Sequence, residues 1–124
     1  MNIVDSSGWL EYFSDGPNAG KFLPPLRDTA NLIVPVVTLY EVFKVVLRER
    51  NESDALAAVA VMQKGHVVDC TAALAVSAAS LSLKHHLPMA DSLILATAQA
   101  YAATLWTQDA DFRSIPGVKY IPSR

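Results

Sequence analysis

The sequence predicts an α/β fold with three layers, α/β/α, in which helices cover both faces of a mostly parallel central sheet of four to five strands. Short apolar runs rich in β-branched residues recur along the chain, as is typical of buried parallel strands. Longer segments with helical patterning separate these runs, and the connections between them are short. No repeat or linker divides the chain, so residues 1–124 are expected to form one domain.

Four short apolar runs predict buried strands, and in three of them a polar residue marks where the strand stops. The predicted buried strands are Asn2–Asp5, Leu32–Val34, His66–Asp69 and Thr104–Thr107. A fifth strand is expected at Val118–Ile121. Because Pro116 and Pro122 flank it, and proline cannot donate to a sheet ladder, this strand is placed at an edge.

Three helices are predicted in the first half of the chain. Ser6 or Ser7 is expected to cap the first, since serine is a favoured N-cap residue. A short helix around Asn18–Leu23 is expected to stop at Pro24-Pro25, because proline disrupts a helix interior. Thr38–Arg50 has the apolar spacing of a long amphipathic helix.

Three further helices are predicted in the second half. One is expected to be capped by Ser53 and to run to Lys64, and Thr71 is expected to cap an Ala/Ser-rich helix that ends near His85. Pro88 then opens the helix within "HLPMADSLILATAQA", because proline is favoured at a first helical position. Asp91 lies in the first turn of this otherwise apolar helix, where an unpaired carboxylate is costly to desolvate.

Composition indicates a folded, cytoplasmic protein. Hydrophobic residues make up 52% of the 124 positions and charged residues 18%, which excludes a disordered chain. The single cysteine, Cys70, excludes an internal disulfide and fits a reducing compartment. The start, "MNIVDSSGW", lacks the basic region of a secretory signal. The longest uncharged run, residues 92–108, is shorter than the ~20 residues of a membrane span, so no membrane association is expected.

The net charge of −2 argues against a protein that simply coats nucleic acid phosphates. If four acids were neutralised by a bound cation, 8 of the 12 Asp and Glu residues would remain against 10 Lys and Arg residues. The remaining surface would then be mildly basic.

Four acidic residues fall close to the predicted carboxyl ends of the strands. Asp5 ends the first strand, Asp109 follows the fourth, and Glu41 is placed in the first turn of the helix after the second strand. Ligands of open α/β sheets collect at this edge. The order of the elements does not establish that the helix of Asp91 begins there too.

Four carboxylates in one pocket would repel one another strongly. Unit charges ~4 Å apart interact by about 4 kcal/mol at an effective dielectric constant near 20. A hard divalent cation relieves this repulsion, and oxygen ligands without cysteine or paired histidines favour Mg²⁺ or Mn²⁺. Such ions bind phosphate oxygens and activate water.

Four segments at these acids resemble the motifs of the PIN-domain family, and most closely the VapC-type toxins of bacterial toxin–antitoxin modules. The segments are "NIVDSS", "TLYEVFK", "PMADSLILATA" and "LWTQDADF", which occur in the family's order. The resemblance implies a PIN-like fold and a Mg²⁺- or Mn²⁺-dependent endoribonuclease. It also implies a homodimer that is silenced by a cognate antitoxin protein.

The resemblance also implies roles for individual residues. The acidic metal site and catalytic centre would consist of Asp5, Glu41, Asp91 and Asp109, supported by Ser7 and Thr107, with Asp111 as a further acid. All the acidic positions of the family's motifs are occupied, so nothing in them marks an inactive protein.

Each acid also has a purely structural interpretation. Asp5 and Asp91 could cap their own helices, Asp109 could lie in a turn, and Glu41 could pair with Lys44 on the next helical turn. The sequence does not exclude any of these taken singly. Their occurrence together, on matching motifs, favours the metal site.

Two surfaces of the chain suggest binding partners. Lys44 and Arg48 follow Glu41 at i+3 and i+7, so they form a basic stripe that either contacts RNA phosphates or is simply solvated. The segment Ser53–Lys64 is small and apolar on several faces, which favours a helix at a dimer interface. Val61 is expected to be exposed on this helix.

Two other functions compete with the nuclease. A non-catalytic PIN-like module that binds protein or RNA would keep the fold without cleavage. A phosphatase of the haloacid-dehalogenase type also places an aspartate at the end of its first strand, but it needs a second aspartate two residues later, where this chain has Ser7.

Overall fold

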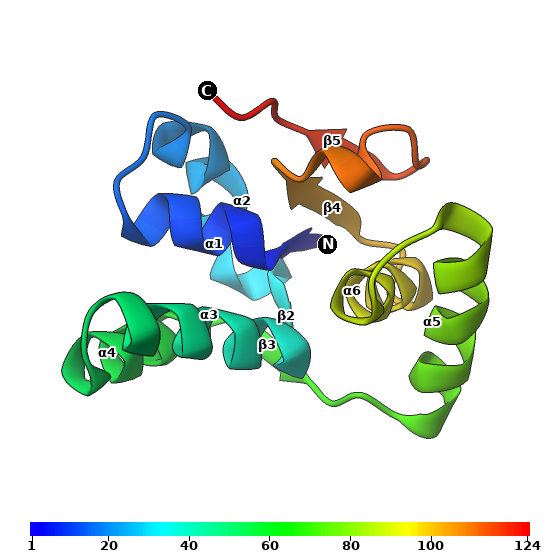
Figure 1. Ribbon diagram of the computed structural model, residues 1–124, viewed down its shortest axis with the longest axis horizontal. Coiled ribbons are helices and arrows are strands. Elements are labelled where there is room, and N and C mark those ends of the chain that lie inside the picture. Colours follow the sequence, from blue (N-terminus) through cyan, green and yellow to red (C-terminus); the bar gives the residue numbers. More distant parts are fainter.

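The computed structural model describes residues 1–124 and has the expected α/β architecture, with five strands, six α-helices and three short 3₁₀ turns (Figure 1). The strands are β1 (Asn2–Val4), β2 (Ile33–Pro35), β3 (His66–Val68), β4 (Thr104–Thr107) and β5 (Val118–Tyr120). The helices are α1 (Ser6–Phe13), α2 (Leu23–Arg27), α3 (Val36–Glu49), α4 (Glu52–Met62), α5 (Ala72–His85) and α6 (Met89–Ala100). The 3₁₀ turns are η1 (Ala19–Phe22), η2 (Thr29–Asn31) and η3 (Ala110–Phe112). None of the helices combines the length and the apolar character that crossing a membrane requires.

All five strands are parallel. Strands β1, β4 and β5 form one ladder in that order, and β2 pairs with β3 in a second. A parallel bridge between Asn2 and Leu32 joins the two ladders, which gives the order β3-β2-β1-β4-β5. The predicted parallel sheet is confirmed, and β5 lies at an edge as expected.

The sheet separates two apolar cores, which makes the fold three-layered. In β1, Ile3 points into the core beneath α5 and α6, and Val4 points into the core beneath α1, α3 and α4. Ile33 and Val34 of β2 divide in the same way. Successive side chains of a strand point to opposite faces, so runs apolar at every position are needed to fill both cores. Figure 1 shows α6 lying between the strands and α5.

The prediction that His66–Asp69 forms a buried strand is wrong. Strand β3 is an edge strand, and His66 and Val67 are exposed. The apolar run His66–Asp69 resembles the run of a central strand. However, β3 pairs with β2 on one side and has no neighbouring strand on the other. Strand β2 begins one residue later than predicted and includes Pro35.

The helix starts in the first half of the chain differ from the predictions. Asp5, and not Ser6 or Ser7, caps α1. The short helix expected around Asn18–Leu23 is the 3₁₀ turn η1. Pro24 and Pro25 do not stop a helix but lie in the first turn of α2, where no backbone donor is needed. Helix α3 starts at Val36, so Glu41 lies in its second turn and not in its first.

The helix starts in the second half agree better with the sequence. Thr71 caps α5 as predicted, and Pro88 is the N-cap of α6 and not its first helical residue, so this helix begins one residue later than predicted. Asn51 caps α4 in place of Ser53. Val61 is half-buried against the core beneath α4, so the prediction that it is exposed is wrong.

Candidate metal centre

Five carboxylates from four parts of the chain converge at the carboxyl edge of the sheet. Asp5 follows β1, and Asp109 follows β4, the strand paired with β1. Glu41 comes from α3, and Asp91 lies in the first turn of α6, which begins at this edge. Asp111 belongs to η3, directly after Asp109. The structure thus brings together all four predicted metal ligands and the additional acid.

Asp5 is almost completely buried, at 2% exposure, and three donors hold its carboxylate. Oδ1 accepts hydrogen bonds from Ser7 Oγ at 2.7 Å and from the backbone N of Gly8 at 3.0 Å, and Oδ2 accepts one from Thr107 Oγ1 at 2.6 Å. A carboxylate has about four acceptor positions. One position on Oδ2 therefore remains for a cation, so the capping role and a ligand role are compatible.

Burial raises the pKa of Asp5 to about 6. The hydrogen bonds from Thr107, Ser7 and Gly8 act in the opposite direction by favouring the charged form, while the charge of Asp109 adds to the rise. The two hydroxyls predicted to support the site are therefore the groups that keep this buried carboxylate ionisable near neutral pH.

Thr107 also connects Asp5 with Asp109. Its Oγ1 donates to Asp5 and accepts a hydrogen bond from the backbone N of Asp109 at 2.9 Å, and the side chain is completely buried. Asp109 Oδ1 in turn accepts the backbone N of Asp111 at 2.9 Å, which fixes η3. Asp109 therefore lies in a turn, as its purely structural interpretation predicted. The same turn orients Asp109 and Asp111.

Glu41 accepts a hydrogen bond from Ser6 Oγ at 2.5 Å and forms no ion pair with Lys44. The structural interpretation of Glu41 as half of a salt bridge is therefore wrong. Sequence reasoning missed Ser6 because the two residues are 35 positions apart, and no local pattern connects them. The neighbouring serines divide their roles, with Ser7 bound to Asp5 and Ser6 bound to Glu41.

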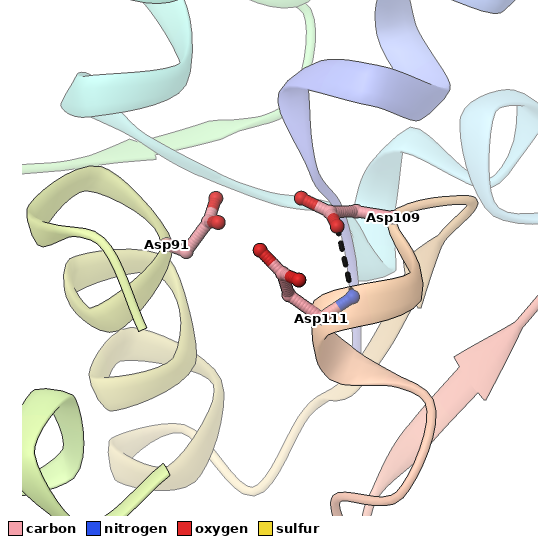
Figure 2. A group of neighbouring side chains, drawn as sticks. All are labelled: Asp91, Asp109 and Asp111. Atoms are coloured by element: carbon pink, nitrogen blue, oxygen red, sulfur yellow. Dashed lines mark hydrogen bonds between the residues drawn. The ribbon is translucent and has the colours of Figure 1, made fainter. Parts of the chain in front are cut away.

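Asp91, Asp109 and Asp111 form the tightest group of acids. One carboxylate oxygen from each lies within 4.8 Å of those from the other two, and Figure 2 shows the three side chains directed into one space. Asp111 was expected only as a further acid, yet it belongs to this group, whereas Asp5 and Glu41 lie outside it.

Asp91 has the most perturbed charge of the site. Burial, followed by the charges of Asp109, Asp5, Glu41 and Asp111, raises its pKa to about 7. The effect of Asp111 is the smallest of the four although it lies close, because its side chain is exposed and water screens it. No side chain caps α6, which rules out the cap interpretation of Asp91.

No basic side chain compensates these acids. The ion pairs of the chain are Arg48 with Glu49 and Arg50 with Asp54, and neither includes any of the five acids. A group of half-buried carboxylates with free oxygens and no cationic partner fits a hard divalent cation such as Mg²⁺ or Mn²⁺.

The loop between β4 and the acids is fixed by a residue that sequence reasoning missed. Asn18 is completely buried, and its Nδ2 donates to Gln108 Oε1 at 3.1 Å and to the carbonyl oxygen of Pro122 at 2.9 Å. The backbone N of Gln108 donates to Ser7 Oγ at 3.2 Å. The residue that precedes Asp109 is thus held from two sides.

The predicted basic stripe of α3, Lys44 and Arg48, is exposed, but one of its two charges is paired with a carboxylate. Arg48 Nε lies 3.0 Å from Glu49 Oε1, and Lys44 Nζ lies 5.6 Å from the ring centroid of Tyr40. The charge of Arg48 is therefore partly compensated, and that of Lys44 is not.

Comparisons with known proteins agree with this arrangement. A family model described as "PIN domain" matches residues 3–118. The chain is similar to one from a toxin–antitoxin complex of Klebsiella pneumoniae, with 23% identity over 98% of this chain and 100% of that one, and a TM-score of 0.80. It is also similar to VapC20 of Mycobacterium tuberculosis, described as a sarcin–ricin loop cleaving toxin, with 18% identity over 100% and 99% of the two chains and a TM-score of 0.78.

A third similar structure is VapBC2 of Rickettsia felis bound to a DNA fragment from their promoter. Its identity is 15% over 98% of this chain and 97% of that chain, with a TM-score of 0.74. A search of curated proteins found no match. At these identities the solved structures establish a common fold.

Replacing Thr107 with valine should destabilise the protein by about 1–3 kcal/mol, because the Asp5 carboxylate and the Asp109 backbone N–H each lose a partner in a buried place. The pKa of Asp5 should rise further, since its strongest hydrogen-bond donor is lost. Urea unfolding measures the first effect. Thr107→Ser keeps the hydroxyl and should cost only about 1 kcal/mol for one methyl group; equal losses in both variants would contradict the role of the hydroxyl.

Asp91→Asn should stabilise the metal-free protein at pH 8 by about 1 kcal/mol, after allowance for solvent screening. The folded-state pKa of Asp91, about 7, exceeds the ordinary value of 3.8. The stability linked to its proton is therefore present below pH 4 and is lost as the pH rises through 7. The melting temperature of the metal-free wild type should fall over this range more than that of the variant.

Added Mg²⁺ should raise the melting temperature of the wild type at pH 8 and that of Asp91→Asn much less, because ligand binding to the folded state alone stabilises it. A gap between wild type and variant that stays constant from pH 4 to pH 8, with equal Mg²⁺ shifts, would contradict this account of Asp91.

Proposed function

The chain belongs to the PIN-domain family, and from this premise we propose that it is a Mg²⁺- or Mn²⁺-dependent endoribonuclease that acts as the toxin of a toxin–antitoxin pair. Residues 1–124 act as one PIN-like domain. The observation that supports this most directly is the convergence of five acids, without any basic partner, at the sheet edge where ligands of parallel α/β folds bind.

In this proposal each acid has a role at the site. Asp91 and Asp109 would hold the ion, with Asp111 beside them, and Asp5 and Glu41 would add negative charge around it. The hydroxyls of Thr107, Ser7 and Ser6 orient Asp5 and Glu41 so that their charges stay directed at the same space. A bound divalent ion supplies Lewis-acid chemistry, because it binds phosphate oxygens and lowers the pKa of a bound water.

The substrate in this proposal is RNA, which is hydrolysed in the cytoplasm. Similar structures come from toxin–antitoxin complexes, which supports a cognate antitoxin protein as a partner. The similar protein described as cleaving the sarcin–ricin loop supports an RNA substrate. We further propose that the active form is a homodimer.

The competing functions make different demands on the site. In the phosphatase interpretation, the residue two positions after Asp5 must be an acid, but Ser7 donates a hydrogen bond to Asp5 instead. In the interpretation as a non-catalytic module, the acids would have no function. Their proximity nevertheless raises the pKa of Asp91, which destabilises the metal-free fold. Both points favour the nuclease.

Cleavage of RNA by the purified protein should require Mg²⁺ or Mn²⁺ and stop in EDTA, and Glu41→Gln should lower its rate by more than about 100-fold. A glutamine side chain can still accept the hydrogen bond from Ser6, so the change removes the charge and leaves the position. Ca²⁺ should bind but support little turnover, because it is larger and less strict in its geometry.

The control is Glu52→Gln, which removes an exposed carboxylate from the first turn of α4 that takes part in no ion pair, and it should leave cleavage unchanged. Robust cleavage in EDTA would refute the metal mechanism. Full activity of Glu41→Gln would remove Glu41 from the site, and metal binding without any cleavage of RNA would favour the non-catalytic module.

Combined replacement of Lys44 and Arg48 by alanine should weaken RNA binding and reduce its salt dependence. Each lost phosphate contact lowers the slope of log K against log salt by up to about 0.7 for single strands. Lys44→Ala alone should account for most of the change, because Glu49 partly compensates Arg48. Filter binding over a salt series measures the slope; an unchanged slope would show that the stripe is only solvated.

A further inference from the structure

Tyr40 is an aromatic side chain on the surface of the protein, directly beside an acid of the metal centre. It precedes Glu41 in α3 and is 64% exposed, more than any other Phe, Tyr or Trp of the chain. Tyr40 is two positions from Thr38 and two from Val42, the buried residues of α3. Since each residue of an α-helix turns about 100° around the axis, the ring lies about 160° from both and points away from the core.

Lys44 lies next to this ring. Its Nζ is 5.6 Å from the ring centroid of Tyr40, within the range of a cation–π contact. Around the helix axis Lys44 lies between Tyr40 and Glu41, about 40° from the first and about 60° from the second. Lys44 takes part in no ion pair. An exposed ring, a free cation and an acid of the metal centre therefore share one continuous face of α3.

The ring borders an open hollow of about 460 Å³ between α3 and α4, which lie side by side (Figure 1). The lining is apolar except for one lysine and consists of Leu39, Tyr40, Phe43, Lys44, Leu47 and Val59. This volume falls within the ~300–1,000 Å³ of sites that bind small organic groups. The lining suits a flat apolar group on an anionic backbone, because the group can contact the apolar side chains while Lys44 binds the anion.

A larger hollow on the opposite side of α3 also adjoins the metal centre, but its charge is unfavourable for RNA. It has a volume of about 690 Å³, and its lining includes Ser7, which donates to Asp5. The lining holds more acids than bases, with Glu11, Glu49 and Asp54 against Arg50. Acids repel a phosphate backbone, so a strand bound at the ion should leave the centre on the side of Tyr40, where Lys44 attracts it.

From these features we propose that Tyr40 is a base-stacking residue for the RNA substrate. An unpaired base stacks on the exposed part of the ring, and Lys44 binds the phosphate that lies between this base and the metal centre. The inference rests on the proposed function for RNA as the substrate. It deepens that proposal by naming a single-stranded segment as the part of the RNA that is bound, because stacking on a side chain needs an unpaired base.

The experiment measures the affinity of the protein for a single-stranded RNA of mixed sequence and about 12 nucleotides, a length within the site sizes of single-strand binders. Ca²⁺ replaces Mg²⁺, so that an ion is present while turnover is slow. Tyr40→Leu keeps an apolar side chain without the ring and should weaken binding by at least about fivefold, because one stacked base is lost. Tyr40→Phe keeps the ring and should bind within about twofold of the wild type.

The matched control is Tyr101→Leu. Tyr101 is also exposed, at 45%, and it follows the last residue of α6. It comes ten residues after Asp91, so it lies about 15 Å further along the helix, away from the edge where α6 begins. Its replacement should therefore leave RNA binding unchanged. Because both tyrosines are exposed, circular dichroism should show folded protein for every variant.

An oligomer of the same length built from abasic ribose units separates the ring from the charge. Tyr40→Leu should bind it as tightly as the wild type does, because it offers no base. Lys44→Ala should weaken the binding of both oligomers and lower the slope of log K against log salt by up to about 0.7, whereas Tyr40→Leu should leave the slope unchanged. In cleavage, Tyr40→Leu should raise KM and leave kcat nearly unchanged, because the ring contacts neither the ion nor the reacting phosphate.

Several results would overturn the inference. These are wild-type RNA affinity in Tyr40→Leu, an equal loss in Tyr40→Phe or in Tyr101→Leu, and an equal loss for the abasic oligomer. A loss of antitoxin binding in Tyr40→Leu with unchanged RNA binding would assign the ring to that partner and would also overturn it.

Because binding is measured without cleavage, these outcomes are separate from the proposed nuclease. If Tyr40 contributes to RNA binding in a protein that cleaves no RNA, the stacking role stands and the nuclease falls. If Tyr40→Leu cleaves RNA with the KM of the wild type, the nuclease stands and the stacking role falls.

Discussion

Mutual repulsion among carboxylates is the constraint around which this edge of the molecule is organised. Two unit charges ~4 Å apart at an effective dielectric constant near 20 repel by about 4 kcal/mol. Here one oxygen from each of three carboxylates lies within 4.8 Å of the others, and two more acids stand close enough to raise the pKa of Asp91 to about 7. The protein places no lysine or arginine against them. This repulsion costs the metal-free protein stability. A bound cation would relieve it, so the arrangement is best explained as a cation-binding site.

The rest of the structure keeps these charges in place. Pairing of β1 with β4 sets Asp5 beside the segment that leads to Asp109, and Thr107 connects the two through its single hydroxyl. Ser6 orients Glu41 from the opposite side, and Asn18 fixes the residue before Asp109. A buried hydrogen-bond network of this kind loses stability when one member is removed. The arrangement of the acids therefore depends on these supporting residues as well as on the acids themselves.

The fold and the acids could be predicted from the sequence because both depend on local patterns. Fully apolar runs identified the parallel strands, and the acids that follow them were assigned to the carboxyl edge. The sequence could not show that Ser6 reaches Glu41, since that contact depends on how α1 packs on α3. It also ranked Asp111 below the other acids, because the proximity of η3 to Asp91 is a tertiary feature that no local pattern shows.

Two errors have a common physical origin. His66–Asp69 has the composition of a buried strand, and Val61 was expected on the exposed face of its helix, but composition does not say which side of an element is covered. The edge position of β3 follows from the order of strands, and the burial of Val61 follows from the packing of α4 on α3. Both are tertiary properties.

The central claim, that the acids form one divalent-cation site, is tested most directly by a crystal of the wild-type protein soaked in Mn²⁺ and measured at an anomalous wavelength. The account predicts an anomalous peak between the carboxylates of Asp91 and Asp109, and the same peak should be absent from Asp91→Asn crystals soaked in parallel. No peak at these acids under saturating Mn²⁺, or a peak that persists unchanged without the Asp91 charge, would contradict it.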